Sequence, residues 1–468
     1  MPGTRHIPRI LWLLLASQLT GCAYFYTFKD QYAGTSRMLI TGNYKQAYHQ
    51  IEAAKNTKYK YKDRVLFYLD AGMLLHYAGD WQKSNEYLSE AERGIEELYT
   101  RSISQAATSF LLNDNALAYG GEDYEDIYLN IFKALNYLHL NEFDEAFVEI
   151  RRADDKLKAL ENKYGELTDA LNGAPDAKVE IKQGTSRFRD SALDRWMSML
   201  MYRNERRLDE ARIDQRKIKA LWRKQAKLYP FKKPDLSKTL APPAYGKTKL
   251  NLLCFSGQGL EKKAASIYLH SEENHLLIGT TREHENLREH PSLLQPIYWE
   301  GINPDLHFKL QYPVLETRGT EVHSIQVNVN GKAHARLERI EDLGRIAKES
   351  WKARLPIILL KTLTRATLKS LATEQAKEQI KNEMGDNGNS YMMGLLMDVA
   401  SSATENADLR VSRFFPSDAF IGEVEVPPGK HAVRVEYRDA AGRILFTDLK
   451  EVDVQPKRLN LVESFYLN

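Results

Sequence analysis

The sequence predicts a multidomain α+β protein. An N-terminal array of helical hairpins is followed by a mixed β region with one long helix, and the chain ends in an antiparallel sheet. From about residue 30 to 228 apolar residues recur at helical spacing and prolines are few. Residues 229–246, YPFKKPDLSKTLAPPAYG, hold four prolines and few core residues, which is typical of a linker. Beyond them, apolar and polar residues alternate around turn signals, as in strands.

Composition limits the possible functions. A chain of 468 residues exceeds one compact core, so two or three domains are expected. With 66 basic and 63 acidic residues the net charge is +3, so no global field attracts nucleic acid. Two cysteines exclude a disulfide framework and a cysteine-rich zinc site. We expect the second, Cys254, to be buried as a small hydrophobe.

The first residues have the organisation of a secretory signal. Arg5 and Arg9 precede an apolar stretch at 10–16, which is too short to span about 30 Å of hydrocarbon. The motif Leu19-Thr20-Gly21-Cys22 then resembles the lipobox of bacterial lipoproteins. This resemblance implies that residues 1–21 are removed as a signal peptide. It also implies that the thiol of Cys22 receives diacylglycerol and that the new amine is acylated.

Such an anchor holds a protein at a membrane durably, because several acyl chains are buried together. Residue 23 is alanine rather than aspartate, so the inner-membrane retention signal of enterobacterial lipoproteins is missing. We therefore expect an outer-membrane protein, lipid-anchored on the periplasmic face rather than the cell surface. The alternative is a cytosolic protein with an apolar first helix and an incidental cysteine.

A phrase recurs within the helical region. It consists of a tight turn, an aromatic residue or leucine, and a small residue three positions later. The copies are Gly42 with Tyr44 and Ala47, Gly79 with Trp81 and Ser84, Asn141 with Phe143 and Ala146, and a fainter Arg206 with Leu208 and Ala211.

This phrase resembles the tetratricopeptide repeat, or TPR, over residues 22–228. Tyr68, Gly72 and Ala134 also fall at positions where that pattern has bulky or small residues. The aromatic or leucine positions lie 37, 62 and 65 residues apart instead of a steady 34, and the closing proline is absent. A generic helical bundle is the alternative. The TPR resemblance implies a concave surface that binds peptides or protein segments.

The second half divides into a β-rich region at 247–340, a helical segment at 341–400 and a C-terminal β region at 401–468. Strands are expected at 248–255, 307–315 and 322–329. Asn330-Gly331 predicts a type I′ hairpin turn leading into a strand at 334–340. A long helix is expected from about 342 to 381, followed by an apolar helix at 391–401 that is too short to span a bilayer.

The two halves together resemble a family of uncharacterised bacterial outer-membrane lipoproteins that join TPR-like helices to a mixed β region. The resemblance rests on three stretches: NLLCFSGQGLEKK at 251–263, LPIILLKTLTRATLKSLATEQA at 355–376, and ENADLRVSRFFPSDAFIGEVEVPPGKHAVRVEY at 405–437. Ser412-Arg413 stands where the family has a tryptophan shortly after its arginine. The resemblance implies a role in the envelope, for some members near activators of peptidoglycan synthesis. An Asp408–Arg410 pair is expected as a buried structural interaction or as part of a binding site.

Catalytic motifs are incomplete. His270, His275, His284 and His290 lie among glutamates, but a zincin motif beginning at His284 fails because Arg288 stands where the second histidine is needed. Ser256 in FSGQG lacks the glycine two residues before it that a nucleophile elbow requires, so a strand-to-loop turn with positive φ at the glycines is expected. No phosphate loop, dinucleotide fingerprint or EF-hand is present.

We therefore expect a non-catalytic, lipid-anchored scaffold that binds a protein or peptide partner in the envelope, without a cofactor, a metal or nucleic acid. The alternative is an envelope hydrolase with its site in residues 250–300. The sequence does not determine the partner or the oligomeric state.

Overall fold

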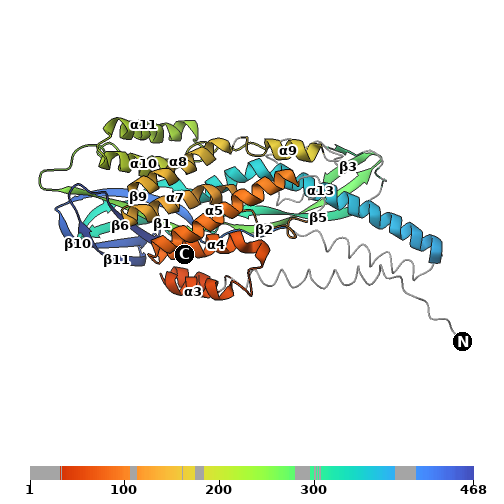
Figure 1. Cartoon of the computed structure of the whole chain (residues 1–468), viewed down its shortest axis with the longest axis horizontal. Helices are drawn as coiled ribbons and strands as arrows, with labels where there is room; N and C mark the ends of the chain where they lie inside the picture. The colour runs from red at the N-terminus through yellow and green to blue at the C-terminus, as the bar shows by residue number, and fades with distance from the viewer. Residues whose placement is uncertain are drawn as a thin grey trace.

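The computed structural model describes residue 32 and residues 34–105, 113–160, 162–173, 184–279, 296–299, 302, 304, 307–384 and 407–468. These residues form helices and three four-stranded sheets, which confirms the expected α+β class (Figure 1). The lipobox residues Leu19 to Cys22 and the expected helix at 391–401 lie outside the described residues.

Helices fill the first half of the chain. They are α3 (Tyr44–Ala54), the short 3₁₀ helix η1 (Tyr61–Asp63), α4 (Arg64–Tyr77), α5 (Trp81–Ser104), α7 (Asp123–Leu140), α8 (Phe143–Ala159), α9 (Gly165–Asn172), α10 (Ala192–Asn204) and α11 (Leu208–Lys224). Apart from η1 and α9, each helix packs on the next along the chain. The helical layer thus runs from α3 on one side of the molecule to α11 on the other (Figure 1).

Strands and one long helix make up the second half. They are β1 (Thr248–Gln258), β2 (Glu261–Glu272), β3 (His275–Gly279), β4 (Ile297–Tyr298), β5 (His307–Glu316), β6 (Ser324–Val329), β7 (Lys332–Arg336), β8 (Glu338–Asp342), α13 (Leu343–Met384), β9 (Pro416–Val426), β10 (Gly429–Arg438), β11 (Ile444–Val454) and β12 (Asn460–Tyr466). Asn330 and Gly331 both have positive φ, 51° and 78°, as the expected type I′ turn between β6 and β7 requires.

The strands form three sheets, and strands from the C-terminal region take part in two of them. Sheet A has the order β12-β1-β9-β8, sheet B β4-β3-β2-β5, and sheet C β11-β10-β6-β7. In sheet A, β12 runs parallel to β1 and β9 antiparallel to it. The C-terminal strands are therefore shared between sheets A and C, and the chain's last strand pairs with the first strand after the proline-rich segment.

Sheet A is the middle of three layers. One face packs on sheet C around a core that includes Leu252, Cys254 and Val435. The other face carries Leu253 and Phe255 and packs into the larger core of the helices. Burial on both faces explains why β1 is a nearly continuous apolar run instead of an alternating one.

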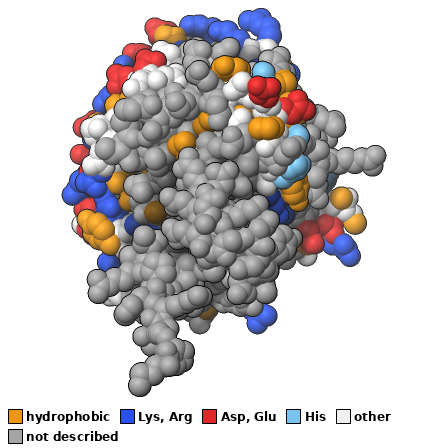
Figure 2. Space-filling model, turned by 90° about the vertical axis from the view of Figure 1, so that its right-hand side faces the viewer, with side chains coloured by type: hydrophobic (Ala, Val, Ile, Leu, Met, Phe, Trp, Pro, Cys, Tyr) orange, Lys and Arg blue, Asp and Glu red, His pale blue; other side chains and the backbone are white. Residues whose placement is uncertain are grey.

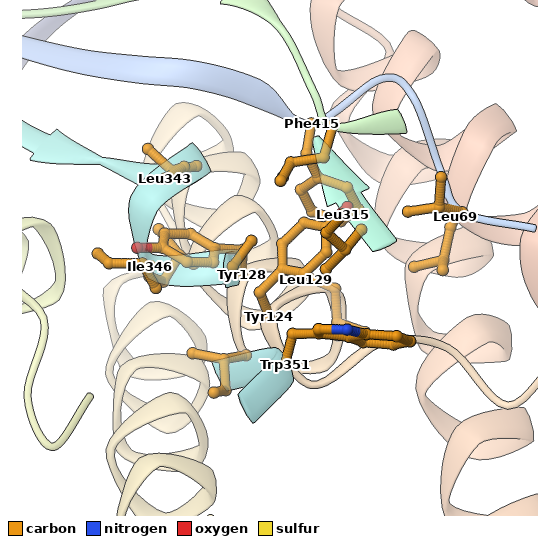
Figure 3. Packing of buried hydrophobic residues seen from close by; sticks show 14 of the residues in the cluster. Leu69, Tyr124, Tyr128, Leu129, Leu315, Leu343, Ile346, Trp351 and Phe415 are labelled. Carbon is orange, nitrogen blue, oxygen red and sulfur yellow. The ribbon is translucent and has the colours of Figure 1, made fainter. Parts of the chain in front are cut away.

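The larger core joins the helical layer to α13 and sheet B. Figure 3 shows Tyr124, Tyr128 and Leu129 of α7 beside Leu315 of β5 and Phe415, together with residues of α13. Because these side chains come from distant parts of the sequence, the helical and β regions are held together by a shared apolar interior.

The four copies of the repeated phrase have the same backbone conformation. Gly42, Gly79, Asn141 and Arg206 lie in the left-handed region, with φ of 74°, 79°, 64° and 62°. In every copy this residue's N–H donates to the carbonyl three residues earlier, and the next N–H donates to the carbonyl five residues earlier. This is the Schellman arrangement that ends a helix. It sets the turn of each hairpin, including the fainter fourth copy.

The small residues of the phrase lie where helices approach closely. Ala47, Ser84 and Ala146 are fully buried. Ser84 Oγ donates a hydrogen bond of 2.8 Å to the carbonyl of Gly72, which joins α5 to α4. A Cβ on Gly72 would lie 2.7 Å from Leu88 Cδ2, so only glycine fits without movement of the neighbouring helix.

The proline-rich segment 229–246 forms neither helix nor strand, but its first part packs against both halves of the chain. Trp222 Nε1 of α11 donates to the carbonyl of Phe231, and Lys249 Nζ of β1 donates to the carbonyl of Thr239. Residues 241–247 are exposed. The segment therefore connects α11 to sheet A through specific contacts.

Candidate functional site

The best-formed pocket among the described residues lies where the helical layer meets α13. It has a volume of about 370 Å³ and is open to solvent on one side. Its walls come from the C-terminal half of α5, the segment 114–123, residues 163–171 around α9, and the first half of α13, with Lys262 of β2, Pro313 of β5, and Asp408 and Arg410. Seven stretches of sequence thus converge on one cavity.

Aromatic and aliphatic side chains form much of the wall. The aromatic ones are Tyr99, Tyr119, Tyr164 and Trp351, and the aliphatic ones include leucines of α5 and α9 and isoleucines of α13. Mostly apolar walls with a few fixed polar groups are characteristic of binding pockets.

Charged side chains complete the lining, and the basic ones are in excess. Six basic residues line the pocket against four acidic ones: Arg101, Lys163, Lys262, Arg354, Lys361 and Arg410 against Asp114, Glu122, Asp123 and Asp408. The described side chains visible on the end of the molecule in Figure 2 mix acidic, basic, histidine and hydrophobic types.

Glu122, at the start of α7, holds two of these cations. Its carboxylate contacts the buried ammonium of Lys262 and lies 3.2 Å from Arg354 Nη1. Lys262 Nζ also lies 4.9 Å from the centre of the Trp351 ring, a favourable cation–π contact. This carboxylate therefore connects α7, β2 and α13 at the base of the pocket.

Two further ion pairs fix the rim. Lys163 Nζ lies 2.8 Å from Asp123 Oδ1, and Tyr164 Oη donates to the same carboxylate. Lys361 Nζ of α13 lies 3.2 Å from Asp114 Oδ1. These contacts attach α9 and α13 to the segment that leads into α7.

Arg410 is the most buried cation of the pocket, with 1% of its side chain exposed. Its Nη1 donates to Asp63 and to the carbonyl of Leu117, and its Nη2 donates to Asp408 and to the carbonyl of Asp114. Nε donates to the other oxygen of Asp408. The expected buried Asp408–Arg410 interaction is therefore present, and it also joins η1 to the pocket wall.

The pKa values of two carboxyl groups that line the pocket indicate a positive electrostatic potential there. Partial burial would raise the pKa of Asp114, but the charges of Lys361, Arg365 and Arg354 outweigh it and hold the pKa below its ordinary value. Burial would also raise the pKa of Asp408, but the charge and hydrogen bonds of Arg410, together with the charge of Lys262, outweigh it and lower that pKa. An anion entering the pocket would experience the same potential.

Behind the wall lies a carboxyl group of different character. Burial, followed by the nearby charge of Glu122, raises the pKa of Glu125 to about 8. The backbone N–H of Ser412 donates to its Oε1, and Tyr119 Oη donates to its Oε2. Ser412 Oγ donates to Asp70, whose pKa burial raises to about 6. These carboxyls join α4, α7 and segment 407–415 and are shielded from the pocket.

The repeat residues singled out from the sequence belong to the helical packing. Tyr44 Oη donates to the carbonyl of Phe465 in β12, and Trp81 stacks on His139 with ring centres 4.4 Å apart. The Tyr68 ring packs edge-on against Tyr87 of α5. Ala134 is fully buried and Phe143 half-buried. None of these residues lines the pocket.

The cluster proposed for a hydrolase does not gather around a nucleophile in the described residues. Cys254 lies in the core between sheets A and C, and burial raises the pKa of its thiol. Ser256 is fully buried, and Gly257 after it has the expected positive φ, 72°. Gly257 lies within β1 rather than in a loop, and Gly259 does not have positive φ, so the expected turn is present only in part. His270 and His275 lie on sheet B, and His284 is outside the described residues.

The described part of the chain contains neither a cluster of metal-ligating side chains nor a membrane-spanning helix. No group of three or more His, Cys, Asp or Glu side chains is arranged to hold a metal ion. No helix there combines the length and apolar character needed to cross a bilayer.

Comparison with known proteins gives no relative: no family model, curated protein or solved structure matches the chain. The case for a function therefore rests on the sequence motifs and on the geometry described above.

Sequence reasoning did not predict the pocket, although it singled out Asp408 and Arg410 as a pair. The charged residues that line the pocket are scattered over about 300 positions, so no single stretch shows that they come together. One local signal was available. Lys262 lies in Glu261-Lys262-Lys263 at the start of a strand, and successive side chains of a strand point to opposite faces, so one of the two adjacent lysines points inward.

Proposed function

We propose that the protein is a lipoprotein anchored through Cys22 to the periplasmic face of the outer membrane, and that it holds a protein partner of the envelope without catalysing a reaction. The lipobox supports the anchor, and the stacked helical hairpins support a TPR-like scaffold. The family resemblance suggests a link to peptidoglycan synthesis or envelope assembly.

The observation that carries the binding role is the pocket between α5, α9 and α13. Its apolar and aromatic wall, its volume of about 370 Å³ and its excess of basic residues favour a protein segment that presents an apolar side chain beside a carboxylate. The lowered pKa of Asp114 and of Asp408 supports an anionic guest, because both carboxyls already respond to a positive potential.

The same electrostatics argue for binding without catalysis. A general base works best when its pKa lies near the operating pH, whereas Asp114 and Asp408 are held ionised by neighbouring cations and are poor proton acceptors. Glu125, with a pKa of about 8, lies behind the wall and already accepts several hydrogen bonds. The pocket's polar groups thus act as fixed contacts for a guest.

The test is photo-crosslinking in living cells from a reactive side chain at Ser102, which lines the pocket on α5. The matched control places the same group at Lys430, which is exposed on sheet C. We expect one dominant protein adduct from position 102, its yield reduced by Arg101→Glu, and no such adduct from position 430. The same adducts from both positions, or a yield unaffected by Arg101→Glu, would contradict the assignment.

A further inference from the structure

Two histidines lie directly opposite each other on sheet B. The antiparallel register of β2 and β5 pairs His270 with His307. Directly opposite residues project from the same face, with Cβ atoms about 4.5–5.5 Å apart. The two rings are indeed close: their centres are 4.3 Å apart and their planes differ by 39°.

One ring nitrogen of His270 has no hydrogen-bond partner among the described residues. This atom, Nδ1, is shielded from solvent. The Nδ1 of His275, on the neighbouring strand, is by contrast 2.9 Å from the carbonyl oxygen of Glu273. Leaving a buried polar group without a partner is unfavourable, so a ligand that supplied the missing contact to His270 would be favoured.

The surroundings of the pair carry charges of both signs. Glu272, two residues along β2 on the same face, is exposed and pairs with His275, beyond which lies Tyr298. In the other direction Tyr268 pairs with Lys309, whose ammonium lies 5.8 Å from the Tyr268 ring, so the side of the pair that faces Glu272 is the one that favours a cation. His307 is exposed, so an ion can reach the pair from solvent. Histidine side chains are visible beside acidic ones on the end of the molecule seen in Figure 2.

We propose that His270 and His307 form a binding site for a late first-row divalent cation, Zn²⁺, Ni²⁺ or Cu²⁺. Imidazole nitrogen suits these ions, whereas Mg²⁺ and Ca²⁺ prefer oxygen ligands. With Zn–N distances of about 2.0–2.1 Å, two nitrogens of a tetrahedral site lie about 3.3 Å apart, which small rotations of neighbouring rings can provide. Glu272, two residues from His270 on the same face of β2, places a carboxylate's negative charge beside the pair.

The site has an open coordination sphere. Within the described residues fewer than three ligating side chains come together, so water or a group from a partner would fill the remaining positions. Such an open site is independent of the pocket between α5, α9 and α13, and the inference does not rest on the proposed function.

The test is calorimetric titration of Zn²⁺ into the full chain carrying Cys22→Ser, so that the anchor thiol takes no metal. We expect one saturable site that His270→Gln and His307→Gln each weaken by about tenfold or more. His323→Gln is the matched control, because His323 is exposed just before β6 and lies outside sheet B. The His323→Gln chain should bind Zn²⁺ with the same affinity as the starting protein.

Electron paramagnetic resonance with Cu²⁺ gives a second readout, in which two coordinated nitrogens should be seen and one lost in His307→Gln. Because His307 is exposed, this variant is expected to keep the starting protein's circular dichroism and urea midpoint. The proposal is overturned if no saturable Zn²⁺ binding occurs below about 1 mM, or if His270→Gln and His307→Gln bind Zn²⁺ as tightly as the control.

Discussion

Replacing Arg410 with methionine tests the ion-pair cluster at the pocket wall. The change keeps much of the side chain's volume but removes the charge that faces Asp63 and Asp408. Arg410 Nη1 lies 2.9 Å from Asp63 Oδ1, and both side chains are at most 3% exposed. Arg410 Nη2 lies 2.7 Å from Asp408, which is 15% exposed and so keeps some contact with water.

Removing one member of a buried ion pair costs about 3–5 kcal/mol, because the remaining charge is left uncompensated. Since solvent can screen part of the Asp408 charge, we expect the free energy of unfolding of Arg410→Met to fall by about 3–4 kcal/mol at pH 7. Adding Asp63→Asn and Asp408→Asn should restore at least half of the loss, because no unpaired charge then remains buried.

Urea denaturation followed by circular dichroism measures these differences. The matched control is Arg93→Met, because Arg93 is 70% exposed and pairs with Glu90, which is itself 43% exposed, and its loss should cost at most about 1 kcal/mol. A loss for Arg410→Met no larger than that of the control would refute the structural role. So would a triple variant less stable than the single one.

The pH dependence of stability gives a second test of the Asp408–Arg410 pair. Burial would raise the pKa of Asp408, but the charge and hydrogen bonds of Arg410, together with the charge of Lys262, place it below its ordinary 3.8 in the folded protein. The pair's stabilisation is therefore present above pH 3.8 and is lost as the pH falls through the lower, folded value. The stability difference between wild type and Arg410→Met should narrow below pH 3.8, and a difference that widens there would contradict the assignment.

Three further predictions concern packing, a turn and a buried acid. Gly72→Ala should lower the free energy of unfolding by about 1–3 kcal/mol through overpacking against α5, whereas Gly319→Ala, with open space at its Cβ, should be nearly neutral in the same urea series. Arg206→Gly should raise the thermal midpoint, because its φ of 62° strains a residue with a side chain by about 1–2 kcal/mol; an unchanged or lower midpoint would count against the shared turn geometry. Burial raises the pKa of Glu341 from 4.5 to about 7, so its contribution to stability is complete below pH 4.5 and is lost as the pH rises to about 7. Glu341→Gln should remove that decline, and identical pH profiles would show that Glu341 does not titrate in this range.

Local features were predictable from the sequence. Gly42, Gly79 and the pair Asn330-Gly331 take the positive φ that glycine, which has no Cβ, and asparagine adopt most readily. Each depends on a few neighbouring residues, so short-range chemistry suffices. The burial of Cys254 likewise follows from the apolar strand around it.

Long-range pairings were not predictable. Nothing in the periodicity of β1 indicates that it pairs in parallel with β12, some 200 residues later. The pocket presents the same difficulty, because the contact of Lys262 with Glu122 depends on how α7, β2 and α13 are placed around a shared core. The sequence shows several histidines between positions 270 and 290, but His270 lies opposite His307 of the neighbouring strand β5 rather than beside another histidine of its own stretch.

The measurement that most directly tests the central claim, an anchored envelope protein, is the intact mass and membrane distribution of the wild-type chain beside Cys22→Ser in a Gram-negative host. The account predicts a wild-type chain that begins at Cys22, carries added acyl mass and pellets with the outer membrane. The Cys22→Ser chain should lack the acyl mass and leave that fraction. Two chains that both behave as full-length soluble protein would contradict the anchor, and the envelope function with it.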